Sequence, residues 1–118
     1  MQADTAKPLE TIKKRADFVR MNASCTKWVS HGLVLQVAPN DLGQCRVGYT
    51  VTKRVDKSAV KRNRIKRRLR AVAADILPLH AKESCDYVLI GRVLSATRPY
   101  ETLQNDLKWC LEKTGYSK

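Results

Sequence analysis

The sequence predicts a small α+β sandwich in which helices cover a mixed sheet of four strands, in the order α-β-β-β-α-β-α. Three observations support this fold class. Residues 45–52 alternate between two faces, as a strand does. Residues 58–77 carry an aliphatic stripe at helical spacing. Residues 86–91 form a short apolar run, typical of a strand covered on both sides. We expect one domain over 1–118, because no Pro/Gly/Ser-rich linker divides the chain.

The first half of the chain predicts one helix and three strands. Residues 1–10 are polar and are expected to be disordered. Residues 11–23 predict a modest helix that is firm from about Arg15. Strands are expected at 28–29 and 33–37, and residues 39–43 give a strong turn signal. Residues 45–52 then place Val47, Tyr49 and Val51 on one face, and we expect this strand to pair with the one before the turn in an antiparallel hairpin.

The second half predicts a long helix, a strand and a final helix. The long helix spans 58–77 and is expected to stop at Pro78, since proline cannot continue the hydrogen-bond ladder. Its core stripe consists of Ile65, Leu69, Val72 and Ile76. A strand follows at 86–91. The last helix is expected to begin with Pro99 at or near its first position, and its inward face consists of Leu103, Leu107, Cys110 and Leu111.

Positive charge is concentrated on the long helix and its approach. Residues 53–70 hold ten Lys or Arg and one acid, Asp56, so they contribute +9 of the net charge of +12. No Asp or Glu occurs from Lys57 to Ala74, which argues against a salt-bridged, solvated face. Arginine outnumbers lysine five to two within 61–70, and its planar guanidinium binds phosphate oxygens in pairs. The stretch therefore predicts nucleic-acid binding, in which each neutralised phosphate releases a counterion.

Other kinds of site have little support. A membrane-surface helix needs Trp, Phe or Leu opposite its bases, whereas the opposite face here is an ordinary core stripe. No apolar run approaches a membrane span and the first ten residues contain no apolar signal region, so we expect a cytoplasmic protein without a membrane partner. The four cysteines form no C-x-x-C pair and His31 and His80 have no ligand spacing, so we expect reduced thiols and no metal site. Scattered acids and unpartnered histidines predict no catalytic residue in the protein.

Two adjoining motifs resemble the bacterial ribonuclease P protein family. The strand RVGYTVTKR at 46–54 is followed by a helix bearing R-N-R, with the sequence KRNRIKRRLR at 61–70. Three further segments agree with this family: KKRADF at 13–18, YVLIGR at 87–92, and the pattern L-x-x-D-L-x-x-x-L at 103–111. The resemblance runs from about Ile12 to Glu112.

The resemblance implies both a topology and a function. The topology is α-β-β-β-α-β-α with an unusual left-handed β-α-β crossover around the basic helix. The function is that of the RNA-binding subunit of ribonuclease P, a monomer in a 1:1 complex with a catalytic RNA, which also binds the 5′ leader of precursor tRNA. In that family the RNA removes the leader endonucleolytically with Mg²⁺. The protein binds no cofactor alone, and it raises affinity for precursor over mature tRNA.

The resemblance assigns the R-N-R helix and its approach to the catalytic RNA. Contacts there are expected mostly to phosphate and sugar, which position the partner without reading its sequence. Asn63 has the alternative role of capping or bonding a loop. The expected residues are Lys53, Arg54, Lys61, Arg62, Asn63, Arg64, Lys66, Arg67, Arg68 and Arg70.

A second surface is implied in a cleft between the first helix and the sheet, where the family holds the single-stranded leader. Such strands bind by stacking on aromatic rings beside a basic track. Phe18 has the alternative of being a core residue. Family members often have aromatic residues where this chain has Asn22 and Gln36, so stacking is expected to be weaker, or shared with Tyr49 or Trp28. The expected cleft residues are Lys13, Lys14, Phe18, Val34, Gln36 and Tyr49.

Three other functions compete with this hypothesis. The first is a structural protein of ribosomal type that binds ribosomal RNA and takes no part in tRNA processing. The second is a DNA-binding regulator, which needs a dimer and a recognition helix that reads bases in the major groove. The third is a self-sufficient nuclease, which would cleave RNA with Mg²⁺ and no RNA subunit.

Overall fold

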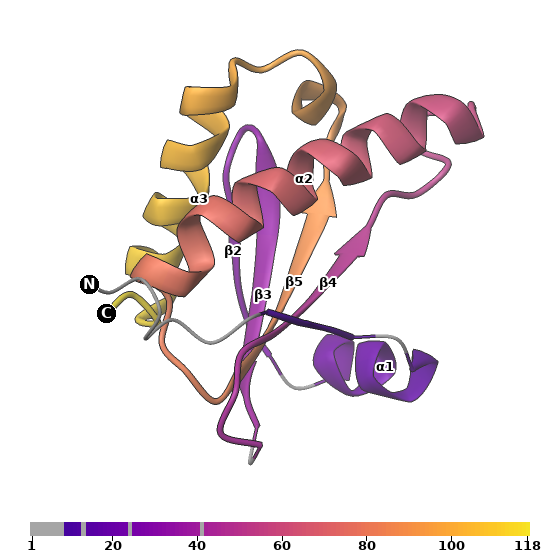
Figure 1. Ribbon diagram of the computed structural model, residues 1–118. Helices are drawn as coiled ribbons and strands as arrows, with labels where there is room; N and C mark the ends of the chain where they lie inside the picture. Colours follow the sequence, from indigo (N-terminus) through magenta and orange to yellow (C-terminus); the bar gives the residue numbers. More distant parts are fainter. Residues whose placement is uncertain (1–8, 13, 24, 41) are drawn as a thin grey trace.

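The computed structural model describes residues 9–12, 14–23, 25–40 and 42–118. These residues form the predicted α+β architecture, a mixed sheet with helices on both faces (Figure 1). The elements in chain order are β1 (Glu10–Thr11), α1 (Arg15–Ala23), β2 (Thr26–Val29), β3 (Leu33–Pro39), β4 (Arg46–Thr50), α2 (Ala59–His80), β5 (Cys85–Gly91), the short 3-10 helix η2 (Val93–Ala96) and α3 (Tyr100–Thr114).

Within the described residues the sheet has five strands in the order β1-β4-β5-β3-β2, one more than expected. The predicted hairpin between β3 and β4 is wrong, because β5 lies between them. It pairs antiparallel with β3 and parallel with β4, and the only antiparallel hairpin in the described sheet joins β2 to β3. The alternation of β4 shows which face it buries but not which strand is its neighbour. The apolar run of β5 does favour a central place, because such a strand must be covered on both faces.

The additional strand is β1, a two-residue segment parallel to β4. Glu10 donates its backbone N–H to the carbonyl of Cys45 at 3.1 Å, and Ile12 donates to Val47 at 2.9 Å. The expectation of disorder over 1–10 is therefore wrong at Glu10, and residues 1–8 lie outside the described part of the chain. Two residues are too few for sequence periodicity to mark a strand.

The unit β4-α2-β5 is a left-handed crossover, as the resemblance implies. In Figure 1 both strands run upward, α2 passes in front of the sheet, and the chain moves from β4 to its left-hand neighbour β5. Most parallel β-α-β units are right-handed. Helix α2 runs diagonally across the sheet, and its first turns project beyond the ends of the strands (Figure 1).

Helix α2 begins after Ser58, whose hydroxyl accepts a hydrogen bond from the backbone N–H of Lys61. Its predicted end at Leu77 is wrong by three residues, since Pro78 lies inside the last turn and the helix runs to His80. A proline there removes only one ladder hydrogen bond. The ladder resumes at Ala81, which donates to Leu77 at 3.0 Å.

The described part of the chain forms two hydrophobic cores, on opposite faces of the sheet. The larger is covered by α2 and α3, and it contains the predicted stripe of α2 and the predicted inward face of α3. The smaller lies under α1 and consists of Ile12, Met21, Ala38 and Val88. Because the nine-residue α1 is the only helix on this face in the described chain, it covers only part of the sheet. The uncovered part forms the floor of a hollow.

Candidate RNA-binding surfaces

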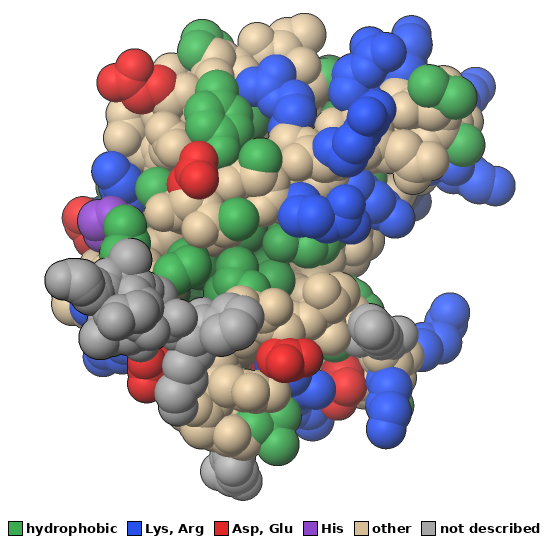
Figure 2. Space-filling model, viewed as in Figure 1, with side chains coloured by type: hydrophobic (Ala, Val, Ile, Leu, Met, Phe, Trp, Pro, Cys, Tyr) green, Lys and Arg blue, Asp and Glu red, His purple; other side chains and the backbone are tan. Residues whose placement is uncertain are grey.

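The first half of α2 presents a dense group of unneutralised bases. Lys61, Arg64, Arg67 and Arg70 are exposed, and Figure 2 shows Lys and Arg side chains gathered over this end of the helix. None of the Lys or Arg side chains on α2 forms an ion pair with a described carboxylate. The ion pairs among the described residues involve Arg20, Arg46 and Arg98, which lie outside α2. The helix thus keeps its positive field available to an external polyanion.

Two of the predicted RNA-binding arginines also hydrogen-bond within the fold. Arg68 is half-buried and donates to the backbone carbonyls of Ala96 and Arg98, which fastens α2 to η2 and the start of α3. Arg62 donates to the carbonyls of Asp56 and Lys57 at 2.9 and 2.8 Å. The sequence pattern placed both near the core stripe, but it could not show these carbonyl partners, which lie outside the helix.

Asn63 is exposed and makes no described hydrogen bond, while Ser58 caps the helix. Ser58 therefore fills the capping role that was the alternative for Asn63. Asn63 instead lines a shallow hollow on α2 of about 460 Å³, together with Val60, Lys66, Arg67 and Arg70. Lys53 and Arg54 are exposed on the approach to the helix.

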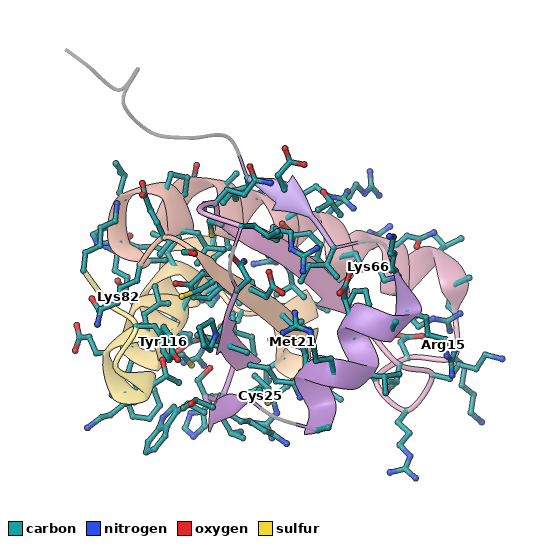
Figure 3. The ribbon with its side chains drawn as sticks, turned by 90° about the horizontal axis from the view of Figure 1, so that it is seen from below. Arg15, Met21, Cys25, Lys66, Lys82 and Tyr116 are labelled. Carbon is teal, nitrogen blue, oxygen red and sulfur yellow. The ribbon has the colours of Figure 1, made fainter. Side chains whose placement is uncertain are left out.

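A separate cleft of about 490 Å³ lies between α1 and the uncovered part of the sheet. It brings together three predicted residues, Phe18, Gln36 and Tyr49. Its basic rim consists of Arg15 on α1 and Lys66 on α2, which lie on the same side of the molecule in Figure 3. Figure 2 shows the notch between the basic end of α2 and α1.

Val34 does not line this cleft. It lies in the adjoining hollow of about 610 Å³, whose rim carries His31, Arg54 and Arg92. Ile90 lines both hollows, so the two adjoin at β5. Phe18, Gln36 and Tyr49 thus line the cleft and Val34 lines the adjoining hollow, and we call these two hollows together the groove.

Phe18 is both a packing residue and a cleft residue. Its ring lies against β4 so closely that a Cβ on Gly48 would approach two ring carbons to 2.7 Å. Gly48 is the residue that permits this close approach. Phe18 is only half-buried, and it borders both the core under α1 and the cleft.

Tyr49 lies at the junction of the cleft and α2. The guanidinium carbon of Arg70 lies 5.4 Å from the centroid of its ring, a cation–π contact. Burial raises the pKa of Tyr49 to about 12, despite the opposing charge of Arg70, so its hydroxyl stays protonated. Trp28, the other candidate for shared stacking, packs instead against Trp109 of α3 with ring centroids 5.7 Å apart, and it does not line the cleft.

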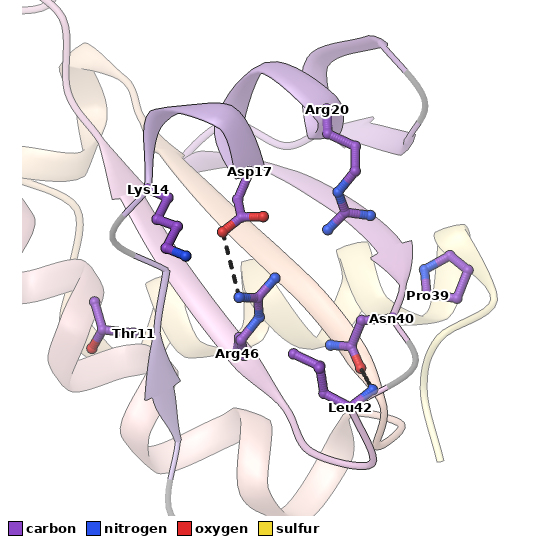
Figure 4. A pocket seen from close by; sticks show the side chains of 8 residues that line it. All are labelled: Thr11, Lys14, Asp17, Arg20, Pro39, Asn40, Leu42 and Arg46. Atoms are coloured by element: carbon purple, nitrogen blue, oxygen red, sulfur yellow. Dashed lines mark hydrogen bonds and ion pairs between the residues drawn. The ribbon is translucent and has the colours of Figure 1, made fainter.

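The predicted rim residue Lys14 does not line the cleft. Lys13 lies outside the described residues. Lys14 lines a third hollow, of about 580 Å³, beside Asp17 and Arg20 (Figure 4). Arg15 lies at the rim of the cleft instead. Helical spacing could have identified it, because Arg15, Phe18 and Val19 recur at i, i+3 and i+4 and all line the cleft.

A buried carboxylate beneath α1 was not foreseen from the sequence. Asp86 of β5 is fully buried and accepts hydrogen bonds from Arg46 at 2.7 and 2.8 Å, Arg20 at 2.6 Å and Asn40 at 2.8 Å. Burial alone would raise the pKa of Asp86, but the hydrogen bonds from Arg46, Asn40 and Arg20 outweigh it and hold the pKa below its usual value. This network ties α1 to the sheet and so fixes the cleft wall.

Within the described part of the chain, His, Cys, Asp and Glu form no group of three or more that could hold a metal ion. Nor does any described helix have the length and apolarity to cross a membrane. The surfaces that do stand out are the basic helix and the neighbouring groove, which suit binding of a polyanion.

Comparison with known proteins gives one consistent family. The family model for ribonuclease P matches residues 7–115. The ribonuclease P protein component of Paramagnetospirillum magneticum is 47% identical over 112 residues, covering 91% of this chain and 84% of that protein. The corresponding component of Caulobacter vibrioides is 42% identical over 105 residues, covering 86% and 68%.

Solved structures agree with these sequence relatives. The RNase P protein of Staphylococcus aureus superposes with a TM-score of 0.76 at 27% identity, covering 92% of this chain and 97% of that one. The RNase P protein of Thermotoga maritima has the same fold, with a TM-score of 0.72 at 22% identity over 83% and 91% of the two chains. The chain therefore belongs to the ribonuclease P protein family.

Proposed function

We propose that this chain is the protein subunit of ribonuclease P and binds RNA through two adjoining surfaces. The outward bases of α2, with Lys53 and Arg54, bind the catalytic RNA. The groove between α1 and the sheet binds the 5′ leader of precursor tRNA. The observation that carries the proposal is the set of bases on α2 that no described carboxylate neutralises.

The two surfaces meet at Lys66. This residue lines both the cleft beside Phe18 and the shallow hollow on α2 beside Arg67. Its ammonium group can therefore contact phosphates on either side of the junction. Such an arrangement supports a role in which the protein holds a single strand close to a structured RNA.

The protein's contribution is binding and positioning, and the phosphodiester chemistry belongs to the RNA partner with Mg²⁺. We place this complex in the cytoplasm, with one protein for each catalytic RNA and precursor tRNA as the substrate. The basic surface lowers the repulsion between two polyanions, so less Mg²⁺ is needed to bring them together.

Reconstitution tests this function directly. The protein is combined with a bacterial ribonuclease P RNA and a precursor tRNA at low Mg²⁺, and release of the 5′ leader is followed on a gel. We expect cleavage at Mg²⁺ concentrations where the RNA alone is inactive, and none with protein alone. Binding to the RNA without any change in its Mg²⁺ requirement would instead favour a structural RNA-binding protein of ribosomal type.

A further inference from the structure

Cys45 directly precedes β4, and Cys85 is the first residue of β5. Arg46 lies opposite Asp86 and Val47 opposite Tyr87 in the parallel ladder, so Cys45 and Cys85 are the two residues directly before its first pair. The backbone is held on both outer sides, because Cys45 accepts a hydrogen bond from Glu10 and Cys85 lies opposite Pro39 of β3. Adjacent strands lie about 4.8 Å apart. This spacing falls within the range of about 4.4–6.8 Å that a disulfide bridges between Cα atoms.

The two thiols also share a face of the sheet. Side chains two residues apart along a strand point the same way, and Val47 and Tyr87 both lie in the core beneath α2. Cys85 belongs to that core and Cys45 packs against it. The pKa of Cys45 is raised to about 12, first by burial and next by the neighbouring Cys85.

We propose that Cys45 and Cys85 are an oxidisable dithiol that forms a disulfide between β4 and β5. A hydroperoxide is a sufficient oxidant. One thiolate attacks a peroxide oxygen, the O–O bond breaks, and a sulfenic acid and water are formed from hydrogen peroxide. The second thiol attacks the sulfenic sulfur, the S–S bond forms, and a second water leaves. Two thiols and one hydrogen peroxide thus give one disulfide and two waters.

Access determines which thiol reacts first and how fast. Cys45 is half-buried and lines a narrow cavity of about 20 Å³ beside Leu9 and Lys118, whereas Cys85 is only 5% exposed. Cys45 is therefore the first to react. Because the thiolate is the reactive form and the pKa values of both thiols are raised, oxidation is slow at neutral pH and accelerates as pH rises.

The other two cysteines serve as internal controls. Cys25 packs against the core under α1, and Cys110 is buried in the core under α2 and α3. They lie on opposite faces of the sheet from each other, so they cannot pair within one molecule. The Cys45–Cys85 link closes a loop that contains all of α2, and it leaves the outward bases of that helix untouched. It should stabilise the fold by restricting the unfolded chain.

Peptide mapping tests the assignment. The intact protein is treated with hydrogen peroxide at pH 8, its remaining thiols are alkylated, and it is digested with trypsin without reduction. We expect a linked pair of peptides, residues 28–46 and 83–92, that is two hydrogens lighter than their sum and separates on reduction. Oxidation should raise the melting temperature by several degrees and leave RNA affinity within twofold.

Variants separate this pair from the other thiols. Cys45→Ala should abolish both the linked peptides and the gain in melting temperature, while Cys25→Ala should keep both. Should Cys45→Ala fail to fold, the peptide map of the unaltered protein still decides. Complete alkylation of both thiols after prolonged oxidation, a link to Cys25 or Cys110, or a sulfinic acid at Cys45 without a cross-link would overturn the proposal.

Discussion

Arg46 and Asp86 form a bidentate pair across the parallel strands β4 and β5, and both hydrogen bonds between them are 2.8 Å or shorter. The carboxylate has no exposed surface. It also holds Arg20 of α1 and Asn40 of the loop after β3, so a single buried charge joins four segments of the chain. Removing it should leave Arg46 without its main counter-charge.

Asp86→Asn should lower the free energy of unfolding by about 3 kcal/mol, the usual cost of breaking a buried pair by removing one partner. The effect should depend on pH. The folded-state pKa of Asp86 lies below its unfolded value, so this stabilisation is complete above the unfolded pKa of about 4 and is lost as pH falls through the folded pKa. Urea unfolding at pH 6 and pH 3 should show a smaller difference between variant and wild type at the lower pH. An equal difference at both pH values would contradict this account.

Arg64→Ala/Arg67→Ala should weaken binding to the catalytic RNA and leave the fold intact, because both side chains are exposed and form no ion pair with a described carboxylate. The slope of log affinity against log salt should fall by about one unit for each phosphate that the protein no longer neutralises. Filter binding at several salt concentrations measures this slope. Lys82→Ala/Lys113→Ala is the matched control, since it removes two exposed bases that lie outside the basic half of α2, and its slope should hardly change.

Arg68→Lys should act on stability and not on the salt dependence of RNA binding. A lysine keeps the charge but cannot donate to the carbonyls of Ala96 and Arg98 together. We expect a loss of about 1–2 kcal/mol of unfolding free energy, comparable to one charged hydrogen bond. Thermal unfolding and the salt slope should be measured on the same preparation. Weaker RNA binding at unchanged stability would place Arg68 on the RNA instead, because lysine cannot replace a bidentate phosphate contact.

Gly48→Ala should destabilise the protein by about 1–3 kcal/mol through overpacking, because the added methyl group would meet the Phe18 ring at 2.7 Å. Phe18→Ala removes that obstacle. The Gly48→Ala/Phe18→Ala double variant should therefore be more stable than the two single losses predict. Chemical denaturation of all four proteins gives the coupling energy. Additive losses would mean that the two residues do not touch.

Phe18→Ala should reduce discrimination between precursor and mature tRNA in the holoenzyme, since it removes the one aromatic ring that α1 presents to the cleft. The fold should survive, because the ring is only half-buried. The affinities for precursor and mature tRNA, both measured with the same catalytic RNA, give the discrimination ratio. Phe18→Leu is a useful control, because it keeps most of the packing volume and removes stacking. A normal ratio in both variants would assign Phe18 to the core alone.

Local sequence patterns predicted the helices and strands better than they predicted the strand order and the hand of the crossover. The stripe from Ile65 to Ile76 identified the buried face of α2 and hence which bases point outward, because helical spacing is a local property. The insertion of β5 between β3 and β4 was missed, since strand pairing depends on residues distant in sequence. The resemblance to a known family supplied the hand of the crossover, which no residue pattern contains.

The sequence likewise predicted part of the candidate site. Exposed bases on α2 follow from charge and periodicity, whereas the hydrogen bonds of Arg62 and Arg68 within the fold depend on backbone carbonyls that composition cannot locate. Asp86 looked like an ordinary residue at the start of a strand, and its network joins residues up to 66 positions apart. Phe18 was left open between core and cleft, and its packing against Gly48 gives it a part in both.

The outer strands of the sheet bear on how this protein behaves at high concentration. An open sheet edge is a template for pairing with another molecule, and proteins protect it with very short strands or with lysine. Here one border is the two-residue β1, and the other is the four-residue β2 with Lys27 exposed at its middle. Both borders are therefore poor templates for strand pairing between molecules, so the protein should stay monomeric when it is concentrated.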